Sequence, residues 1–484
     1  MKTISRKSNI VKIALCSRVI LVFLQFLFNH IIPDHNANVF EYPKENGTES
    51  SVDKVVQHLF LGFLRWDAHY FMHIAKYGYT YENTLAFFPL YPVLGTLFAK
   101  IFCIQNVIST DSALLLTFII LNIVFFIFSA LTLFELGCKL LPRKQAYYSA
   151  LLFCWNPASV FFIAPYTECL FSWLSFKSML NCIILYEKYC KLRLRIVIYD
   201  ILYLVPIALS GLTRSNGLIN IGFFLYILAC IFLKNFIEIK SSMFKKFAKR
   251  LSLILAFIII TTFGVTFCIV PFDLFQIYCY RLFCFDFIRD IPPVVEMYGN
   301  NNKMVLLGTF TKHNQTWCHN KLPLAYLYVQ EQYWNVGFLR YYEFKQVPNF
   351  LLAAPILGFF MYNCKKYFTK SYPKCILEIF KFDINQIKSN VIFENSLLYV
   401  FMIHGVFLSV FCMFFIHIQV STRFLCSSSP LLYWFSADYL TEEGRLCDLK
   451  DFNKFPFKRK FIILYYFTYF IVGTAMFCNF LPWT

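Results

Sequence analysis

The sequence predicts an all-α polytopic membrane protein with about eleven transmembrane helices and further helices lying in the membrane interface. Hydrophobic residues make up 58% of the 484 residues and charged residues only 15%, too few to cover a soluble domain with polar surface. Apolar runs of bilayer length recur along the chain, and lysine and arginine gather in alternate connections between them. We therefore expect a single multi-pass transmembrane domain over residues 1–484.

The first span is predicted at 11–32, directly after a basic flank that contains Lys2, Arg6 and Lys7. This flank is typical of a signal peptide, but no small-residue cleavage site follows, so an uncleaved signal anchor is expected. The remaining apolar runs predict spans near 112–134, 146–164, 168–186, 197–211, 217–233, 251–271, 348–362, 396–418, 424–440 and 461–481.

The formal charge of +18 indicates orientation and not nucleic-acid binding, because the basic residues form short clusters between apolar runs and no continuous basic face. The positive-inside rule places these clusters, and with them the N-terminus, in the cytosol. The clustered segments lie near 139–144, 188–195, 245–250, 363–395 and 458–460, of which 363–395 is the predicted basic cytosolic loop.

The opposite side then receives two long segments, 33–110 and 272–347, which we expect to be luminal. N-x-S/T acceptor sequences begin at Asn46 and Asn314, and both fall in these segments. This topology requires 86–104 to rest in the interface without crossing. Of the eighteen cysteines, Cys279, Cys284 and Cys318 lie in a polar luminal stretch where two could pair, and the sequence leaves the pair open.

An interfacial helix is predicted over 63–77, with an aromatic stripe on one face and Arg65, His69 and Lys76 on a solvated opposite face. Asp67 projects beside the aromatic stripe, where desolvation penalises an ionised carboxylate and favours proton uptake. Asp67 is therefore the candidate general base.

Two alternatives accompany this interpretation. Asp67 could instead form a structural ion pair with a nearby arginine, since such pairs also occupy positions of this kind. His69 and His73 have the i, i+4 spacing of a metal site, but interfacial histidines are commonly just solvated, and we expect no metal. The sequence contains no glycine-rich phosphate loop, which disfavours a nucleotide substrate, and no cofactor is expected.

Five short motifs lie in order along the chain. They are Arg65-Trp66-Asp67 with Ala86-Phe87-Phe88-Pro89, Asn156-Pro157-Ala158-Ser159 with Tyr166-Thr167-Glu168, Thr213-Arg214-Ser215-Asn216-Gly217, Tyr333-Trp334-Asn335-Val336-Gly337-Phe338-Leu339-Arg340, and Arg423-Phe424-Leu425 with Ser428-Ser429-Pro430. Together these motifs resemble the PIG-V family of mannosyltransferases. They occur in the family's order and cover most of the chain from 65 to 434, whereas the basic insert near 363–390 and the histidines at 69 and 73 depart from the pattern.

The resemblance implies a GT-C glycosyltransferase of the endoplasmic reticulum membrane with a luminal active site. Such an enzyme moves mannose from dolichyl-phosphate mannose to the 6-hydroxyl of the first mannose of a GPI precursor, with inversion. Asp67 would be the base, and Arg214 and Arg423 would receive the donor phosphate. The motifs supply further substrate-binding candidates: Trp66, Tyr70, Asn156, Glu168, Asn216, Trp334, Asn335 and Arg340.

The expected partners are the two lipid-linked substrates and the membrane, without nucleic acid, and a small accessory membrane subunit is left open. Two rival functions remain. A transferase of the same class could use another acceptor, and a lipid transporter could also carry acids and arginines at membrane level. Repeated halves would favour a transporter, but the sequence shows none.

Overall fold

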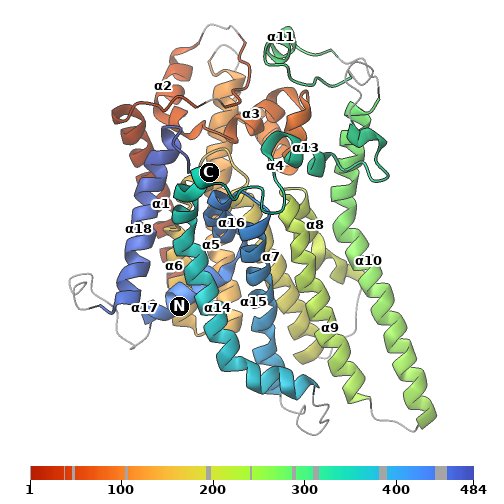
Figure 1. The fold of residues 1–484 in the computed structure, drawn as a ribbon. Helices are drawn as coiled ribbons and strands as arrows, with labels where there is room; N and C mark the ends of the chain where they lie inside the picture. Colours follow the sequence, from red (N-terminus) through yellow and green to blue (C-terminus); the bar gives the residue numbers. More distant parts are fainter. Residues whose placement is uncertain are drawn as a thin grey trace.

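The computed structural model describes residues 2–483 apart from residue 38 and the segments 46–48, 104–106, 192–197, 240–242, 286–289, 309–315, 381–389 and 442–454. Eight of the described helices are long and apolar enough to cross a membrane, and they run along a common axis in Figure 1. They are α1 (Lys2–Ile31), α5 (Thr110–Leu140), α7 (Glu168–Tyr186), α9 (Ile221–Glu238), α10 (Met243–Phe283), α14 (Val347–Phe380), α15 (Asn390–Phe414) and α18 (Phe457–Cys478). This confirms the all-α polytopic class, whereas the number of eleven crossings stays a prediction.

Three of the expected spans are interrupted helices. The segment 146–164 consists of α6 (Arg143–Cys154) and η3 (Ser159–Phe162), 197–211 of η5 (Ile198–Leu204) and α8 (Val205–Gly211), and 424–440 of parts of α16 (Ser421–Ser428) and α17 (Pro430–Thr441). Proline explains two of these breaks, because Pro157 and Pro430 cannot continue the preceding helix. Interrupted backbone is tolerated at membrane depth only where protein groups satisfy it.

Arg18 of α1 supplies such groups at the α6–η3 break. Its buried guanidinium donates to Cys154 O at 3.2 Å and to Ser159 O at 3.0 Å, and it lies 3.9 Å from the centre of the Phe126 ring. These contacts satisfy carbonyls on both sides of the interruption. The first helix is therefore a packed part of the bundle.

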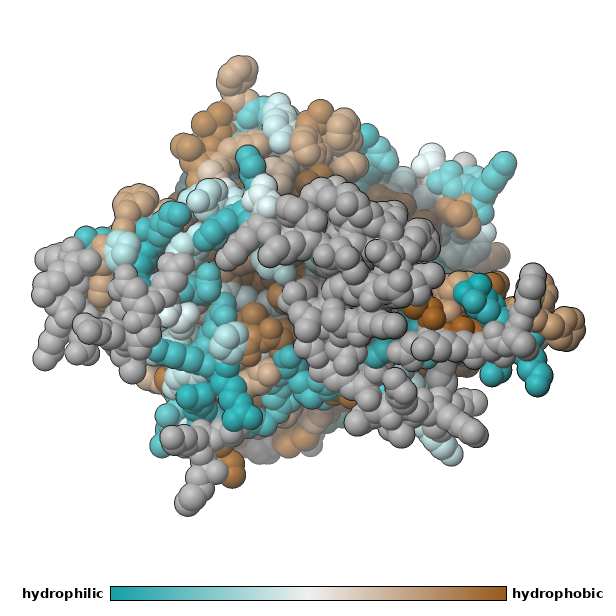
Figure 2. Space-filling view, turned by 90° about the horizontal axis from the view of Figure 1, so that it is seen from below, coloured by the Kyte–Doolittle hydropathy of each residue, from teal (hydrophilic) through white to brown (hydrophobic). Residues whose placement is uncertain are grey.

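Figure 1 places the N-terminus and the starts of α10 and α15 at the lower end of the bundle. Figure 2 views this end, where hydrophilic side chains lie among apolar ones. The connection between α14 and α15 is shorter than the predicted loop 363–395, because α14 extends to Phe380 and α15 begins at Asn390. The assignment of this end to the cytosol stays a prediction.

The first long segment forms α2 (Ser51–Phe60), η1 (Leu61–Phe63), α3 (Ala68–Tyr77), η2 (Glu82–Ala86) and α4 (Leu90–Phe102) at the upper end. The predicted helix over 63–77 was wrong at its start, because α3 begins only at Ala68, after a turn in which Trp66 has φ 54°. The 13 residues of α4 span about 20 Å, too short to cross a bilayer. This agrees with a non-crossing segment at 86–104.

The second long segment packs onto the first. It contains α11 (Pro293–Asn301), η7 (Thr316–His319), α13 (Ala325–Trp334) and η8 (Phe344–Gln346). Glu82 of η2 is buried and accepts hydrogen bonds from Trp317 Nε1 at 2.9 Å and Tyr333 Oη at 2.8 Å. A disulfide joins Cys284 to Cys318 and resolves the cysteine pair that the sequence left open. The two segments thus form one assembly above the bundle.

Candidate active site

A strained turn carries Asp67. Trp66, in the left-handed region that bulky side chains rarely adopt, directly precedes Asp67, which is the N-cap residue of α3. The buried Tyr166 hydroxyl accepts a hydrogen bond from Asp67 N at 3.0 Å and donates one to Arg65 O at 3.3 Å. One hydroxyl therefore holds the backbone on both sides of Trp66 and fixes the backbone position from which the Asp67 side chain extends.

Arg65 supports the same turn from below. Its guanidinium donates to Cys478 O and Asn29 Oδ1, both at 2.8 Å, and pairs with Asp34 at 3.0 Å. Burial lowers the pKa of Arg65, and Asp34 partly offsets this effect. The expectation that Arg65 lies on a solvated face was therefore wrong, because the side chain is buried and ties α3 to α1 and α18.

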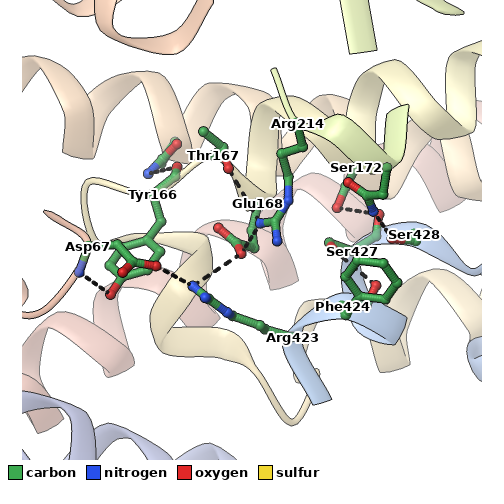
Figure 3. A network of polar contacts seen from close by, with 12 residues as sticks. Asp67, Tyr166, Thr167, Glu168, Ser172, Arg214, Arg423, Phe424, Ser427 and Ser428 are labelled. Carbon is green, nitrogen blue, oxygen red and sulfur yellow. Dashed lines mark hydrogen bonds and ion pairs between the residues drawn. The ribbon is translucent and has the colours of Figure 1, made fainter. Parts of the chain in front are cut away.

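Two carboxylates and two arginines from four distant segments meet beside this turn (Figure 3). Arg423 Nη1 lies 3.0 Å from Asp67 Oδ2 and 3.7 Å from Glu168 Oε1. Arg214 Nη1 donates to Glu168 Oε1 and lies 3.4 Å from Thr167 Oγ1. We call Asp67, Glu168, Arg214 and Arg423 the charge network. Its formal charges cancel, which offsets part of the cost of enclosing charged groups.

The members of the charge network differ in access. The Glu168 side chain is fully enclosed, whereas the Asp67 side chain is 28% exposed. Burial alone would lower the pKa of Arg423, but the carboxylates of Asp67 and Glu168 outweigh it and raise that pKa. Arg423 Nε is buried and has no hydrogen-bond partner among the described residues. The network therefore presents one accessible carboxylate beside a permanently charged guanidinium that has an unused donor.

An aromatic cluster lies one turn beyond Asp67. The Tyr70 ring stacks between Phe40 and Phe87, with ring centres 4.4 and 4.5 Å away. Trp334, at the end of α13, meets both Tyr70 and Phe87 edge to face at 5.9 Å. Burial, followed by the charge of Asp67, raises the pKa of Tyr70. The structure thus brings two predicted binding residues, Tyr70 and Trp334, to the edge of the charge network.

The two histidines of α3 are buried, contrary to the prediction of a solvated face. Burial lowers the pKa of His69 and of His73 to about 3, so both rings are neutral near pH 7. His73 Nε2 lies 2.7 Å from Thr80 Oγ1, and its ring stacks on Tyr81 with centres 4.8 Å apart. Within the described part of the chain, no third side chain of metal-binding type joins them. Their observed contacts are those of packed core residues.

Asn156 and Asn216 lie in buried structural positions. Asn156 Oδ1 accepts a hydrogen bond from Ala158 N at 3.0 Å and so stabilises the α6–η3 turn. Asn216 Nδ2 donates to Ser428 Oγ at 3.2 Å and links η6 (Ser215–Asn220) to α16. A Cβ added to Gly217 would meet the Ser210 carbonyl at 2.2 Å. Gly217 therefore permits close packing on α8.

Asn335 and Arg340 lie farther from the charged groups, in the connection after α13. Asn335 has φ 51° and forms the C-cap of α13, and exposed Arg340 pairs with Glu331 at 2.6 Å. The predicted glycosylation sites at Asn46 and Asn314 lie outside the described residues.

Tyr166 positions the backbone of Asp67, a role that the sequence analysis missed. The only available signal was its place in the Tyr166-Thr167-Glu168 motif, because its partners are more than 90 residues away. The same motif pointed to Glu168 but not to its two arginine partners.

Comparison with known proteins extends over the whole chain. Residues 6–484 match the family model described as mannosyltransferase (PIG-V). GPI mannosyltransferase 2 of Drosophila pseudoobscura pseudoobscura is 35% identical, covering 98% of this chain and 99% of the relative. Human GPI alpha-1,6-mannosyltransferase 2 is 34% identical, covering 99% of each. Among solved structures, the archaeal oligosaccharyltransferase AglB from Archaeoglobus fulgidus is similar at 9% identity with a TM-score of 0.44, covering 96% of this chain and 56% of that one. On the evidence of the family model and of relatives that align from end to end, the chain belongs to the PIG-V mannosyltransferase family.

Proposed function

We propose that this protein transfers the second mannose of the GPI anchor, in α-1,6 linkage, from dolichyl-phosphate mannose to the first mannose of the precursor. The names of the similar proteins support the mannosyl transfer and its linkage. The carrying observation is the charge network, in which Asp67 is accessible and adjacent to a guanidinium while Glu168 is enclosed. A transferase that splits a sugar phosphate needs a base and a receiver for phosphate, and these two groups match that need.

In the proposed reaction, Asp67 accepts the proton of the acceptor 6-hydroxyl as its oxygen attacks the anomeric carbon of the donor mannose. The bond between that carbon and the phosphate oxygen breaks on the opposite face, so the configuration inverts. Phosphate is already a competent leaving group and needs no carboxylic acid to protonate it, in contrast to a glycosidase substrate. Glu168, enclosed and paired with arginine, is accordingly a neutraliser of the arginines and not a second acid.

The departing dolichyl phosphate gains negative charge, which Arg423 and Arg214 are placed to receive. A guanidinium remains protonated and offers several donors in fixed geometry. Tyr70, Trp334 and Trp66 are proposed sugar-binding residues, because Tyr70 lies one turn after Asp67 and contacts Trp334, and Trp66 directly precedes Asp67. Four other candidates are proposed to stabilise the turns around them and not to bind substrate: Asn156, Asn216, Asn335 and Arg340.

We place the active site in the lumen of the endoplasmic reticulum, with the N-terminus in the cytosol. The disulfide between Cys284 and Cys318 supports this placement, because it lies in the upper assembly and disulfides persist in oxidising compartments. GT-C architecture and the lipid-linked donor belong to the same proposal.

The decisive experiment identifies the lipid that accumulates when the protein is removed. A GPI precursor with a single mannose should build up, and microsomes that contain the protein should convert it with dolichyl-phosphate mannose. Accumulation of a precursor at another stage, or of no precursor, would contradict the proposed acceptor. A mannosylation defect confined to other glycans would favour the rival transferase.

A further inference from the structure

An exposed apolar strip follows the connection between α13 and α14. Phe344 is 98% exposed, and its neighbours along the strip are also large apolar or aromatic side chains that face outward. The strip consists of Phe338, Leu339, Tyr342, Phe344, Val347 and Leu351. Soluble surfaces rarely keep so many large apolar side chains exposed in one short segment, so a covering partner is indicated.

We propose that this strip, 338–347 with the first turn of α14, lies in the headgroup layer of the bilayer and anchors the active site to the lipid surface. The candidate span that includes α14 begins at Phe344, and Val347 and Leu351 are exposed on it. The strip is therefore continuous with a surface that faces lipid. Aromatic side chains concentrate at this depth because they combine an apolar ring with tolerance of the polar boundary.

The charged residues of the strip fit the same position. Arg340 pairs with Glu331 and Lys345 pairs with Glu343, both at 2.6 Å on the surface. Exposed pairs of this kind contribute little to stability in water. The strip accordingly combines protruding rings with compensated charges, a composition suited to an interface of lipid headgroups.

Polar contacts connect this strip to the charge network. Leu339 N donates to Phe414 O, and Tyr342 Oη donates to Met413 O, both at 2.8 Å. These carbonyls belong to the last turn of α15, which leads through η9 (Ile418–Val420) to Arg423 on α16. A strip fixed at the bilayer surface thus fixes the height of Arg423.

His417 completes the connection on the other side. Its Nε2 lies 2.8 Å from Trp334 O, and its ring stacks on Tyr341 with centres 4.6 Å apart. Burial lowers the pKa of His417, which favours the neutral ring as a donor to that carbonyl. Through His417, the strip is therefore connected both to Trp334 and to the segment between α15 and α16. If the donor is lipid-linked, as proposed above, its phosphate enters at the level of this strip.

The depth of the strip is measured first, by an experiment that is independent of the proposed reaction. Phe344→Trp in the full-length protein, reconstituted into nanodiscs with lipids brominated near the headgroup, should add emission that the bromines quench. Leu322→Trp is the matched control, because Leu322 is 75% exposed but lies outside the strip. Equal emission from Phe344→Trp in brominated and unbrominated nanodiscs would overturn the proposal. This is the result expected if a protein partner, and not lipid, covers the strip.

The functional consequence is tested with two donors. Phe344→Ser should raise the KM for dolichyl-phosphate mannose in vesicles by about three- to tenfold, since one large apolar contact with the bilayer is lost. It should leave kcat/KM unchanged for a short-chain, water-soluble polyprenyl-phosphate mannose in detergent, and Leu322→Ser should change neither. Equal losses with both donors would show a role in catalysis or folding and overturn the anchor. Inactivity of the parent protein with both donors, with quenching intact, would refute only the proposed function.

Discussion

Arg423 Nη1 lies 3.0 Å from Asp67 Oδ2, although 356 positions separate the two residues in the sequence. This contact realises the structural ion pair that was the alternative to a catalytic base. The two interpretations are compatible, because 28% of the Asp67 side chain remains exposed and the guanidinium beside it is suited to a phosphate. What decides between a structural and a catalytic Asp67 is therefore the effect of its replacement on rate and on stability taken separately.

Asp67→Asn should lower mannosyl transfer by about a hundredfold or more, because an amide cannot accept the proton of the attacking hydroxyl. The backbone bond from residue 67 to Tyr166 is retained, but buried Arg423 loses its nearest carboxylate, so the midpoint of thermal unfolding should fall while the protein still folds. The measurements are transfer by microsomes and the melting temperature of the purified protein. Normal surface levels of GPI-anchored proteins in cells that express only the mutant at normal abundance would exclude Asp67 as the base.

Arg214→Ala should impair both folding and transfer, since it leaves the enclosed Glu168 carboxylate with a weaker partner at 3.7 Å. Arg214→Lys keeps the charge but not the planar fork, so it should be less impaired than alanine. The double variant Arg214→Met with Glu168→Gln separates the two effects, because it removes both charges. We expect it to recover thermal stability while transfer at limiting donor stays about ten- to a hundredfold low. Recovery of wild-type transfer in the double variant would exclude Arg214 as a phosphate receiver.

The sequence was sufficient for the class of fold, for the two long segments at one end and for the identity of all four residues of the charge network, but not for the contacts between them. It was insufficient for the start of α3, because helical periodicity takes no account of the left-handed Trp66 and its hydrogen-bonded neighbours. Apolar composition also hid the interruptions near Pro157 and Pro430, although proline itself was a visible signal. The meeting of Asp67 with Arg423 depends on contacts between distant segments, which residue spacing does not encode.

Tyr166→Phe should slow transfer without weakening substrate binding. The hydroxyl holds the backbone around Trp66. Its loss should release a strained turn and allow the Asp67 carboxylate to adopt several positions. The loss of one hydrogen bond, about 0.5–1.5 kcal/mol, corresponds to roughly a two- to twelvefold lower kcat with KM unchanged. Tyr433→Phe is the matched control, since it removes another buried hydroxyl that donates to Cys426 O. Equal losses of kcat in both variants would indicate a general effect on packing.

The Cys284–Cys318 disulfide should be detectable in the native protein. Alkylation of denatured protein with a maleimide of high mass should modify two more thiols after reduction than before it. Cys318→Ser should abolish this difference and lower stability by about 2–4 kcal/mol, as expected when a cross-link over 34 residues is lost. Cys279→Ser, which replaces a buried free thiol, should preserve the difference. Identical alkylation with and without reduction would contradict both the disulfide and the luminal placement that it supports.

Acidification should destabilise the protein through the two buried histidines of α3. Burial lowers the pKa of His73 to about 3, and burial together with the positive charges of Arg65 and Lys44 lowers that of His69 to about 3. In the unfolded chain both rings would titrate near 6.5, so the unfolded state binds more protons below that pH. Their contribution to stability is therefore complete above about pH 6.5 and declines toward pH 3, by up to about 1.4 kcal/mol per pH unit for each ring.

Melting temperatures in detergent between pH 7.5 and 5 measure this dependence. His69→Leu removes one of the titrating groups, so its melting temperature should fall less steeply with pH than that of the parent protein, whatever the effect on stability at pH 7.5. His30→Leu is the control, because His30 is exposed on α1. Its curve should run parallel to that of the parent. Three parallel curves would show that His69 is not held neutral by burial, and would reopen the solvated face that the sequence had predicted for α3.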